Sequence, residues 1–220
     1  MNARERIARR AAQEFKDGMF VNLGIGIPVL AANYIAEEVD VTLQSENGIL
    51  GFGPNPEVNE VEQCFCNAAG DPITRVLDTS IFDLQTSFSM IRGGHLDMTV
   101  LGALEVDQEG NIANWALPYT ENAYGPGPGG AMDLLVGAKK IVVTITHNAK
   151  NGAPKILKKC TMNLSAKNAV DLIITELAVI EVTEKGLVLK EIAPETTVEE
   201  VVLKTEADLI IPDDVKTMSF

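Results

Sequence analysis

The chain has 220 residues, of which 46% are hydrophobic and 22% charged, which is typical of a globular protein and excludes disorder, collagen and coiled coil for the whole chain. Its 18 lysines and arginines stand against 31 aspartates and glutamates, a formal net charge of −13. So acidic a chain is poorly suited to nucleic acid, because neutralising phosphates requires a basic surface. A phosphorylated small molecule remains compatible with it, since such a ligand needs only a local basic or backbone N–H site.

Neither a disulfide framework nor a metal site is expected. Cys64, Cys66 and Cys160 are an odd number of cysteines for a chain of this size. Cys64-Phe65-Cys66 also lacks the second pair of ligands that a zinc site requires. No stretch approaches the ~18 uninterrupted apolar residues of a membrane span. The N-terminal segment, MNARERIARRAAQEF, contains no apolar signal region, so we expect a cytoplasmic protein without a membrane partner.

Helical and β-type patterns alternate along the chain. Helices are predicted over residues 2–17 (Asn2 as cap, Gly18 as end), 28–37 (Pro28 first), 131–137, and from the capping-box residue Thr197 to about 206. Residues 77–91 mix polar and apolar side chains with some helical spacing. Strands are predicted over 20–23, 41–44, 98–101, 104–106, 141–146, 172–175, 178–182 and 187–192.

Several of these strands are apolar on both faces, which is typical of a parallel sheet covered by helices on both sides. We therefore predict an α/β fold with a largely parallel sheet. No internal repeat, low-complexity tract or break in composition divides the sequence, so one domain over residues 1–220 is expected.

A glycine-containing turn follows the first predicted strand. Gly24-Ile25-Gly26-Ile27-Pro28 lies between a strand and a helix, where backbone N–H groups can hold an anion and glycines permit close approach. It is not a dinucleotide fingerprint, because the third glycine would fall at Val29, and no Gly-Lys-Ser/Thr follows as in a P-loop. The pattern alone fits either a tight structural turn or a ligand contact.

A second candidate is Ser45-Glu46-Asn47-Gly48, within the segment 43–51. Asn-Gly between apolar runs is typical of a hairpin with a type I′ turn, in which Glu46 would be a solvated carboxylate at a strand end. Alternatively, Glu46 stands where α/β proteins bind ligands, directly after a short apolar strand, and Gly48 leaves one side open to an approaching group. The residues alone leave both interpretations open.

A third candidate is the Gly/Pro run over 125–130, before the helix predicted at Ala131. It fits a rigid turn equally well as a loop whose N–H groups face a ligand oxygen, like an oxyanion hole. Two histidines are more simply structural: His95 has Asp97 nearby but no nucleophile, and His147 ends a strand. The lysine clusters 139–140 and 155–159 fit solvated faces, or contacts with a phosphorylated ligand or a partner chain.

Taken together, these segments resemble the β subunit of the family I CoA-transferases, which include the 3-oxoacid and acetate/butyrate–acetoacetate CoA-transferases. The resemblance runs almost from end to end and implies one α/β domain with an open, mostly parallel sheet flanked by helices. Its signature is the Ser-Glu-Asn-Gly segment around Glu46. The matching segments are 21–28 (VNLGIGIP), 43–51 (LQSENGILG), 91–97 (IRGGHLD), 101–106 (LGALEV), 110–115 (GNIANW) and 129–134 (GGAMDL).

The resemblance implies a covalent mechanism centred on Glu46. In the family the matching glutamate attacks an acyl-CoA and passes through an acyl–glutamyl anhydride to a glutamyl–CoA thioester, which the acceptor acid then resolves. Coenzyme A is a substrate in this scheme, and no resident cofactor or metal is expected. The resemblance assigns the oxyanion and substrate contacts to Asn22, Gly129, Gly130 and Ala131, and the CoA contacts to Gly24, Gly26, Asn47 and Gly48.

The resemblance also implies a second chain. An α subunit normally lies beside the β subunit and contributes to the site, so we expect an α partner and a heterotetramer of two α and two β chains. The loop at 125–128 looks longer and more proline-rich than the family pattern, which leaves the donor and acceptor acids open. Two alternatives are an acyl-CoA hydrolase of the same fold and a non-catalytic CoA or sugar-phosphate binding module, although binding alone needs no nucleophilic carboxylate.

Overall fold

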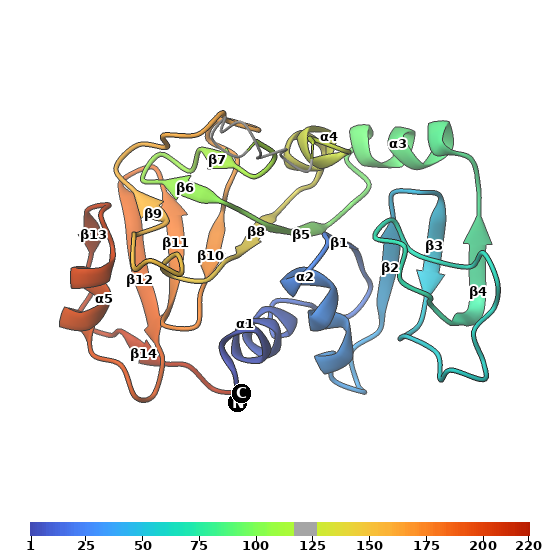
Figure 1. Cartoon of the computed structure of the whole chain (residues 1–220), viewed down its shortest axis with the longest axis horizontal. Helices are drawn as coiled ribbons and strands as arrows, with labels where there is room; N and C mark the ends of the chain where they lie inside the picture. Colours follow the sequence, from blue (N-terminus) through green and yellow to red (C-terminus); the bar gives the residue numbers. More distant parts are fainter. Residues whose placement is uncertain (117–126) are drawn as a thin grey trace.

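A long mixed sheet crosses the computed structural model, which describes residues 1–116 and 127–220 (Figure 1). Within these residues it has eleven strands in the order β13-β12-β11-β10-β8-β5-β1-β2-β3-β4, with β14 beside β12. The strands are β1 (Met19–Leu23), β2 (Val41–Ser45), β3 (Ile49–Phe52), β4 (Arg75–Ile81), β5 (Met98–Gly102), β8 (Ile141–Thr144), β10 (Leu172–Ile174), β11 (Ala178–Thr183), β12 (Gly186–Ile192), β13 (Leu209–Ile210) and β14 (Lys216–Thr217). A smaller sheet, β7-β6-β9, is formed by β6 (Glu105–Asp107), β7 (Ile112–Ala113) and β9 (Ile156–Leu157).

The centre of the large sheet is parallel. Strand β1 pairs in parallel with β2 on one side and β5 on the other, and the parallel pairing continues from β5 through β8 to β10. The connections β2–β3–β4 and β10–β11–β12 on either side are antiparallel. The predicted α/β fold with a mostly parallel sheet is confirmed, and the antiparallel flanks are an addition that the sequence pattern did not indicate.

Helices cover both faces of this sheet. The helices α1 (Ala3–Ala12) and α2 (Ile27–Leu30), with the 3-10 helix η1 (Ala31–Tyr34), lie on one side, and α3 (Leu84–Arg92) and α4 (Ala131–Gly137) lie on the other (Figure 1). Neighbouring residues of one strand therefore face different cores: Val142 packs with the α1 side, and Val143 packs with the α4 side and with α5 (Val198–Lys204). This explains why the central strands are apolar on both faces. None of the helices in the described part of the chain is long and apolar enough to cross a membrane.

The first helix is shorter than predicted. Asn2 caps it as expected, because its Oδ1 accepts the N–H of Glu5 at 2.9 Å. The α-helix ends at Ala12 rather than at residue 17. Beyond it the chain continues as tight turns, and the N–H of Phe15 donates to the carbonyl of Ala12 at 3.2 Å. These turns keep Phe15 buried, so the apolar stripe in the sequence is correct although the helix stops early.

Three other boundaries differ from the sequence prediction. The helix expected over 28–37 is one α-turn from Ile27 followed by η1, because the chain becomes extended at Ile35 to reach β2. Residues 77–91 divide between β4 and α3, which is capped by the Asp83 carboxylate accepting the N–H of Thr86 at 2.8 Å. The last helix is capped by Thr197 as predicted and ends at residue 204.

Candidate active site

The candidate site lies where the chain order reverses across the sheet. After β1 the chain crosses to β2 on one side, while β5, reached through α3, lies on the other side of β1. Such a switch point, at the carboxyl ends of parallel strands, is where open α/β sheets bind ligands. A cavity of about 460 Å³ opens there, next to Gly24 after β1, Glu46 after β2 and Ala103 after β5.

The walls of this cavity carry little charge. Within the described residues, Glu46 is the only ionisable residue that lines it. Most other lining residues are glycines and apolar residues. Polar groups come mainly from asparagines, namely Asn22, Asn33, Asn55, Asn67 and Asn114. Such a cavity suits a partly apolar ligand whose reacting group is brought to one carboxylate.

Glu46 stands on the turn of the β2–β3 hairpin. Ser45 pairs with Ile49, which leaves Glu46, Asn47 and Gly48 as the turn, and the N–H of Gly48 donates to the carbonyl of Ser45 at 3.0 Å. Only Gly48 has a positive φ, +109°, so this is a three-residue turn and not the type I′ turn that Asn-Gly suggested. A side chain on Gly48 would overlap the carbonyl of Phe82, so the glycine permits a close approach of two backbone segments.

Burial raises the pKa of the Glu46 carboxyl above the ordinary value. The backbone N–H of Gly130 faces the carboxylate and acts in the opposite direction, while the negative charge of Asp133 raises the pKa further. No lysine or arginine among the described lining residues offsets the desolvation. Among the described residues, the half-buried carboxylate therefore has few groups that stabilise its charge, and it is more basic than an exposed glutamate.

The glycines before α4 line the cavity on the side that faces Glu46. A side chain on Gly130 would collide with the Glu46 carboxylate, its Cβ lying 2.9 Å from Glu46 Cδ and 3.0 Å from Phe88 Cζ. The backbone of Gly130 is unstrained (φ −87°), so the close approach is what requires a glycine there. Gly129 has a φ of +49°, and a Cβ on it would lie 3.9 Å from Glu46 Oε1. The N–H of Ala131 donates to the carbonyl of Pro128 at 3.0 Å. Residues 125 and 126 of the Gly/Pro run lie outside the described residues.

Asn22 belongs to a buried polar chain beside the cavity. Its side-chain amide donates to Gln44 Oε1 at 2.6 Å, and its Oδ1 accepts the hydroxyl of Thr99 at 3.3 Å. Gln44 in turn donates to the hydroxyl of Ser87 at 2.9 Å. These hydrogen bonds link β5, β1, β2 and α3, so Asn22 lines the cavity while its side chain fixes the strands that carry the site.

The other residues predicted for the site fall into two groups. Gly24 lines the cavity and lies close to β5, because its N–H donates to the carbonyl of Val100 at 2.8 Å. The second group, formed by Gly26, Asn47 and Gly48, is not among the described residues that line the cavity. Gly26 precedes α2 with a φ of +94°, and the Asn47 amide donates to the carbonyl of Cys66 at 2.9 Å.

Some parts of the site are not marked by any motif in the sequence. The loops 53–55 and 67–69 form cavity wall, and Phe88 of α3 packs against the Gly130 position. The Gly-Pro-Asn-Pro run from residue 53 is a turn signal, and nothing in it indicates a cavity.

His95 and Asp97 lie away from the cavity. Asp97 accepts the N–H of Phe20 and the ammonium of Lys139, a structural arrangement, and His95 is exposed. In the described part of the chain, no three or more His, Cys, Asp or Glu side chains gather as metal ligands would.

The fold and the cavity define an α/β protein with a cavity at the switch point of its sheet, lined by one carboxylate among the described residues. A family model described as "Coenzyme A transferase" matches residues 4–204. The acetate CoA-transferase subunit beta of Haemophilus influenzae is 51% identical over 219 residues, which is 99% of this chain and 96% of that protein. The chain belongs to the coenzyme A transferase family, and it is a CoA-transferase of the β-subunit type.

Two further comparisons show how the chain relates to larger proteins. The mouse mitochondrial succinyl-CoA:3-ketoacid coenzyme A transferase 2B is 50% identical over 218 residues, covering 98% of this chain and 41% of that protein. A crystal structure of an acyl-CoA transferase from Escherichia coli O157:H7, described as a thioester complex with CoA, matches with a TM-score of 0.74 and 26% identity. That match covers 100% of this chain and 43% of the other. The chain therefore spans about two fifths of these longer proteins.

Proposed function

We propose that this protein transfers CoA from a short-chain acyl-CoA to an acceptor carboxylic acid through a thioester on Glu46. The observation that carries the proposal is the setting of Glu46. Among the described residues it is the one ionisable side chain lining a cavity at the switch point of the sheet, with its pKa raised by burial. A raised pKa makes a carboxylate a better nucleophile than an exposed glutamate, provided that it is ionised.

The proposed reaction runs in two steps that are later reversed. A carboxylate oxygen of Glu46 attacks the thioester carbonyl of the donor. The C–S bond then breaks, which forms an acyl–glutamyl anhydride and releases CoA as a thiolate. The thiolate then attacks the glutamyl carbonyl, which forms the Glu46–CoA thioester and releases the donor acid as its carboxylate. The acceptor carboxylate attacks this thioester and repeats both steps in reverse.

Each step passes through a tetrahedral oxyanion, and the residues around Glu46 support that chemistry. The N–H of Gly130 faces the carboxylate and is a donor available to steady the oxygen charge. A matching role for Ala131 requires its N–H to leave the Pro128 carbonyl. Gly129 and Asn22 complete the proposed oxyanion and substrate contacts.

We propose that coenzyme A is a substrate and that no resident cofactor takes part. Binding energy from the distant parts of CoA is then available at the reacting carbon. The proposed CoA contacts are Gly24, Gly26, Asn47 and Gly48, of which Gly24 lines the cavity in this structure.

We further propose that the chain works with an α subunit in an assembly of two α and two β chains. Full-length relatives are named as beta subunits, and the chain covers only 41% of the longer mouse protein. The names of the relatives include acetate and succinyl-CoA:3-ketoacid transferases. We propose acetate, butyrate and acetoacetate as the acids to screen first.

The test is to trap the thioester. The complex of this chain with its α partner is incubated with acetyl-CoA alone, treated with hydroxylamine and digested, and the peptide containing Glu46 is weighed. We expect a hydroxamate on that peptide in the native protein and none in Glu46→Gln. Transfer to an added acid should fall by at least about 10⁴-fold in Glu46→Gln, the scale of losing a covalent nucleophile.

Two control arms separate the alternatives. Omitting the acceptor acid should stop turnover at the trapped enzyme, and steady release of free CoA would instead identify a hydrolase. Omitting the α partner should leave a folded, inactive chain. Label on a different residue, or full transfer by Glu46→Gln, would contradict the proposal, and tight CoA binding without any label would identify a binding module.

A further inference from the structure

Helix α3 contacts both halves of the candidate site. Before its first turn, the N–H of Phe82 donates at 3.0 Å to the carbonyl of Gly48, which belongs to the turn that carries Glu46. In its middle, the hydroxyl of Ser87 accepts the side-chain amide of Gln44 on β2 at 2.9 Å. The position of α3 is therefore tied to the strand and the turn that carry Glu46.

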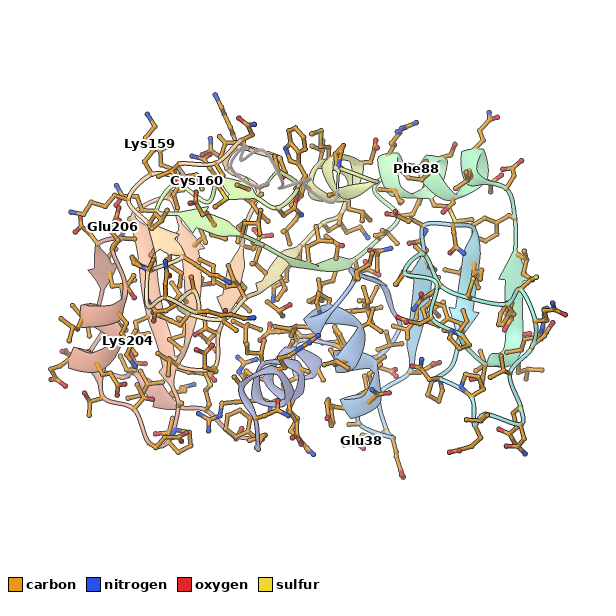
Figure 2. The ribbon with its side chains drawn as sticks, viewed as in Figure 1. Glu38, Phe88, Lys159, Cys160, Lys204 and Glu206 are labelled. Atoms are coloured by element: carbon orange, nitrogen blue, oxygen red, sulfur yellow. The ribbon has the colours of Figure 1, made fainter. Side chains whose placement is uncertain are left out.

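The other side of α3 holds helix α4, whose N-terminal cap is Gly130. Phe88, labelled in the middle of α3 in Figure 2, closes the space at Gly130, with its Cζ 3.0 Å from the position a Cβ would take. Arg92 donates from Nε to Asp133 Oδ1 of α4 at 2.7 Å, and its guanidinium lies 5.4 Å from the centre of the Phe88 ring. At the C-terminal end of α4, a side chain on Gly137 would overlap the carbonyl of Ile91, so α3 and α4 pack closely there.

Arg92 also balances a charge that acts on Glu46. The Asp133 carboxylate disfavours the ionised form of Glu46, and Arg92 is paired with this carboxylate. The only other charged group near the Glu46 turn on α3 is Asp83, whose carboxylate is engaged by the N–H of Thr86. Within the described residues, no ionisable side chain other than Glu46 lines the cavity.

We propose that Arg92 is a positioning residue for the transfer reaction: by holding Asp133 and stacking near Phe88, it keeps Gly130 in place against Glu46. The inference rests on the proposed function of Glu46. Arg92 is not among the described residues that line the cavity. Its side chain is 65% exposed, and ion pairs this exposed contribute little to stability. Its effect is expected on the geometry and charge of the site rather than on folding.

The test uses the complex with the α partner, four single variants and one double variant, Arg92→Ala with Asp133→Asn. We expect Arg92→Ala to slow single-turnover formation of the Glu46 adduct by about 10-fold, less than the roughly 10²-fold that a misplacement of about 1 Å costs. Arg92→Lys keeps the charge and should recover part of the rate. Arg75→Ala is the matched control, because Arg75 also pairs with a carboxylate (Glu62) and lies 4.3 Å from a phenylalanine ring (Phe65), but away from Gly130. Its rate should stay within about twofold of the native rate, as for an ordinary surface change.

The fourth variant, Asp133→Asn, and the titration of Glu46 separate positioning from a merely structural role. The pKa of the Glu46 carboxyl is followed by ¹³C NMR without substrate. Removing Arg92 leaves the Asp133 charge uncompensated and should move the Glu46 titration to higher pH, whereas Asp133→Asn should move it to lower pH. In the double variant the effect of Arg92→Ala on the titration should disappear.

The outcomes distinguish the two proposals. If the native complex forms the Glu46 adduct and Arg92→Ala behaves like Arg75→Ala in rate and titration, the positioning role is wrong. If the titrations shift as expected but no adduct forms on Glu46, the contact network is correct and the proposed function is wrong. Shifts of the Glu46 titration in the same direction in Arg92→Ala and in Asp133→Asn would also overturn the inference.

Discussion

Two carboxylate sites of this protein differ in what surrounds the acid. At the cavity, burial raises the pKa of Glu46, and the negative charge of Asp133 raises it further. Within the described residues, the N–H of Gly130 is the one donor that opposes this shift. At the small sheet, Asp107 is 1% exposed yet fully supplied with donors. Its carboxylate accepts the backbone N–H groups of Glu109, Asn111 and Cys160 and the side-chain amide of Asn111.

The difference separates an acid that organises the structure from Glu46, the acid that we propose to be reactive. Glu105, next to Asp107 in β6, is likewise satisfied by two N–H groups and a hydroxyl from residues 161 and 162. The charge of this pair acts on its surroundings: burial and then the carboxylates of Asp107 and Glu105 raise the pKa of the Cys160 thiol to about 12 (Figure 2). A saturated acid organises a loop, whereas an acid short of donors beside an open cavity is free to react.

The largest effect on the reaction rate is expected from a substitution at Gly130, which faces Glu46 across the cavity. Gly130→Val places a branched side chain against Glu46 and Phe88 without straining the backbone. We expect the single-turnover acylation rate to fall by at least about 10²-fold, the scale of losing one oxyanion donor. The free energy of unfolding should fall by no more than about 1 kcal/mol, an ordinary single-site effect. A normal acylation rate in folded Gly130→Val would show that the glycine only bends the loop.

A substitution at Asp107 should instead lower the stability of the protein and leave the reaction rate unchanged. Asp107→Asn keeps the shape of the side chain, but each Asp107 oxygen accepts two hydrogen bonds, so either orientation of the amide sets a donor against donors. We expect the free energy of unfolding, measured with urea, to fall by about 2–3 kcal/mol. The acylation rate per folded molecule should be unchanged. A stable Asp107→Asn protein would mean that this acid is not the structural counterpart of Glu46.

The sequence indicated much of this arrangement but could not decide what Glu46 does. The residues alone allowed a hairpin or a ligand site at Glu46. The structure shows the hairpin and places the Glu46 carboxylate at a cavity, so the two interpretations are compatible. The signature motif singled out this glutamate only by resemblance. The strands predicted over 141–146 and 172–175 are present as β8 (141–144) and β10 (172–174), because strands covered on both faces are apolar throughout.

What the sequence could not show is the convergence of distant segments. Phe88 reaches Gly130, 42 positions further along the chain, only because α3 and α4 pack together, and no periodic pattern records such a contact. Likewise His147 is buried between the hydroxyls of Thr175 and Thr205, and burial lowers its pKa to about 4. Its place at the end of a strand gave no indication of these partners.

The smallest expected effect is also the most direct contrast between the two acids. Glu46→Gln removes a charge that burial disfavours, so we expect the free energy of unfolding at pH 7 to rise. Because Glu46 is only half-buried and solvent screens its charge, the rise should stay below about 1 kcal/mol, the scale of one stabilising substitution. The sign follows from proton uptake: because the folded pKa of Glu46 lies above the unfolded one, the native form binds more protons between the two values and loses stability as pH rises through them. The advantage of Glu46→Gln should thus be full above the folded pKa and should shrink as pH falls toward that of an ordinary glutamate. Urea unfolding of both proteins across this range measures the gap. A gap that widens on acidification, or a destabilised Glu46→Gln, would place Glu46 with the structural acids and remove the contrast with Asp107.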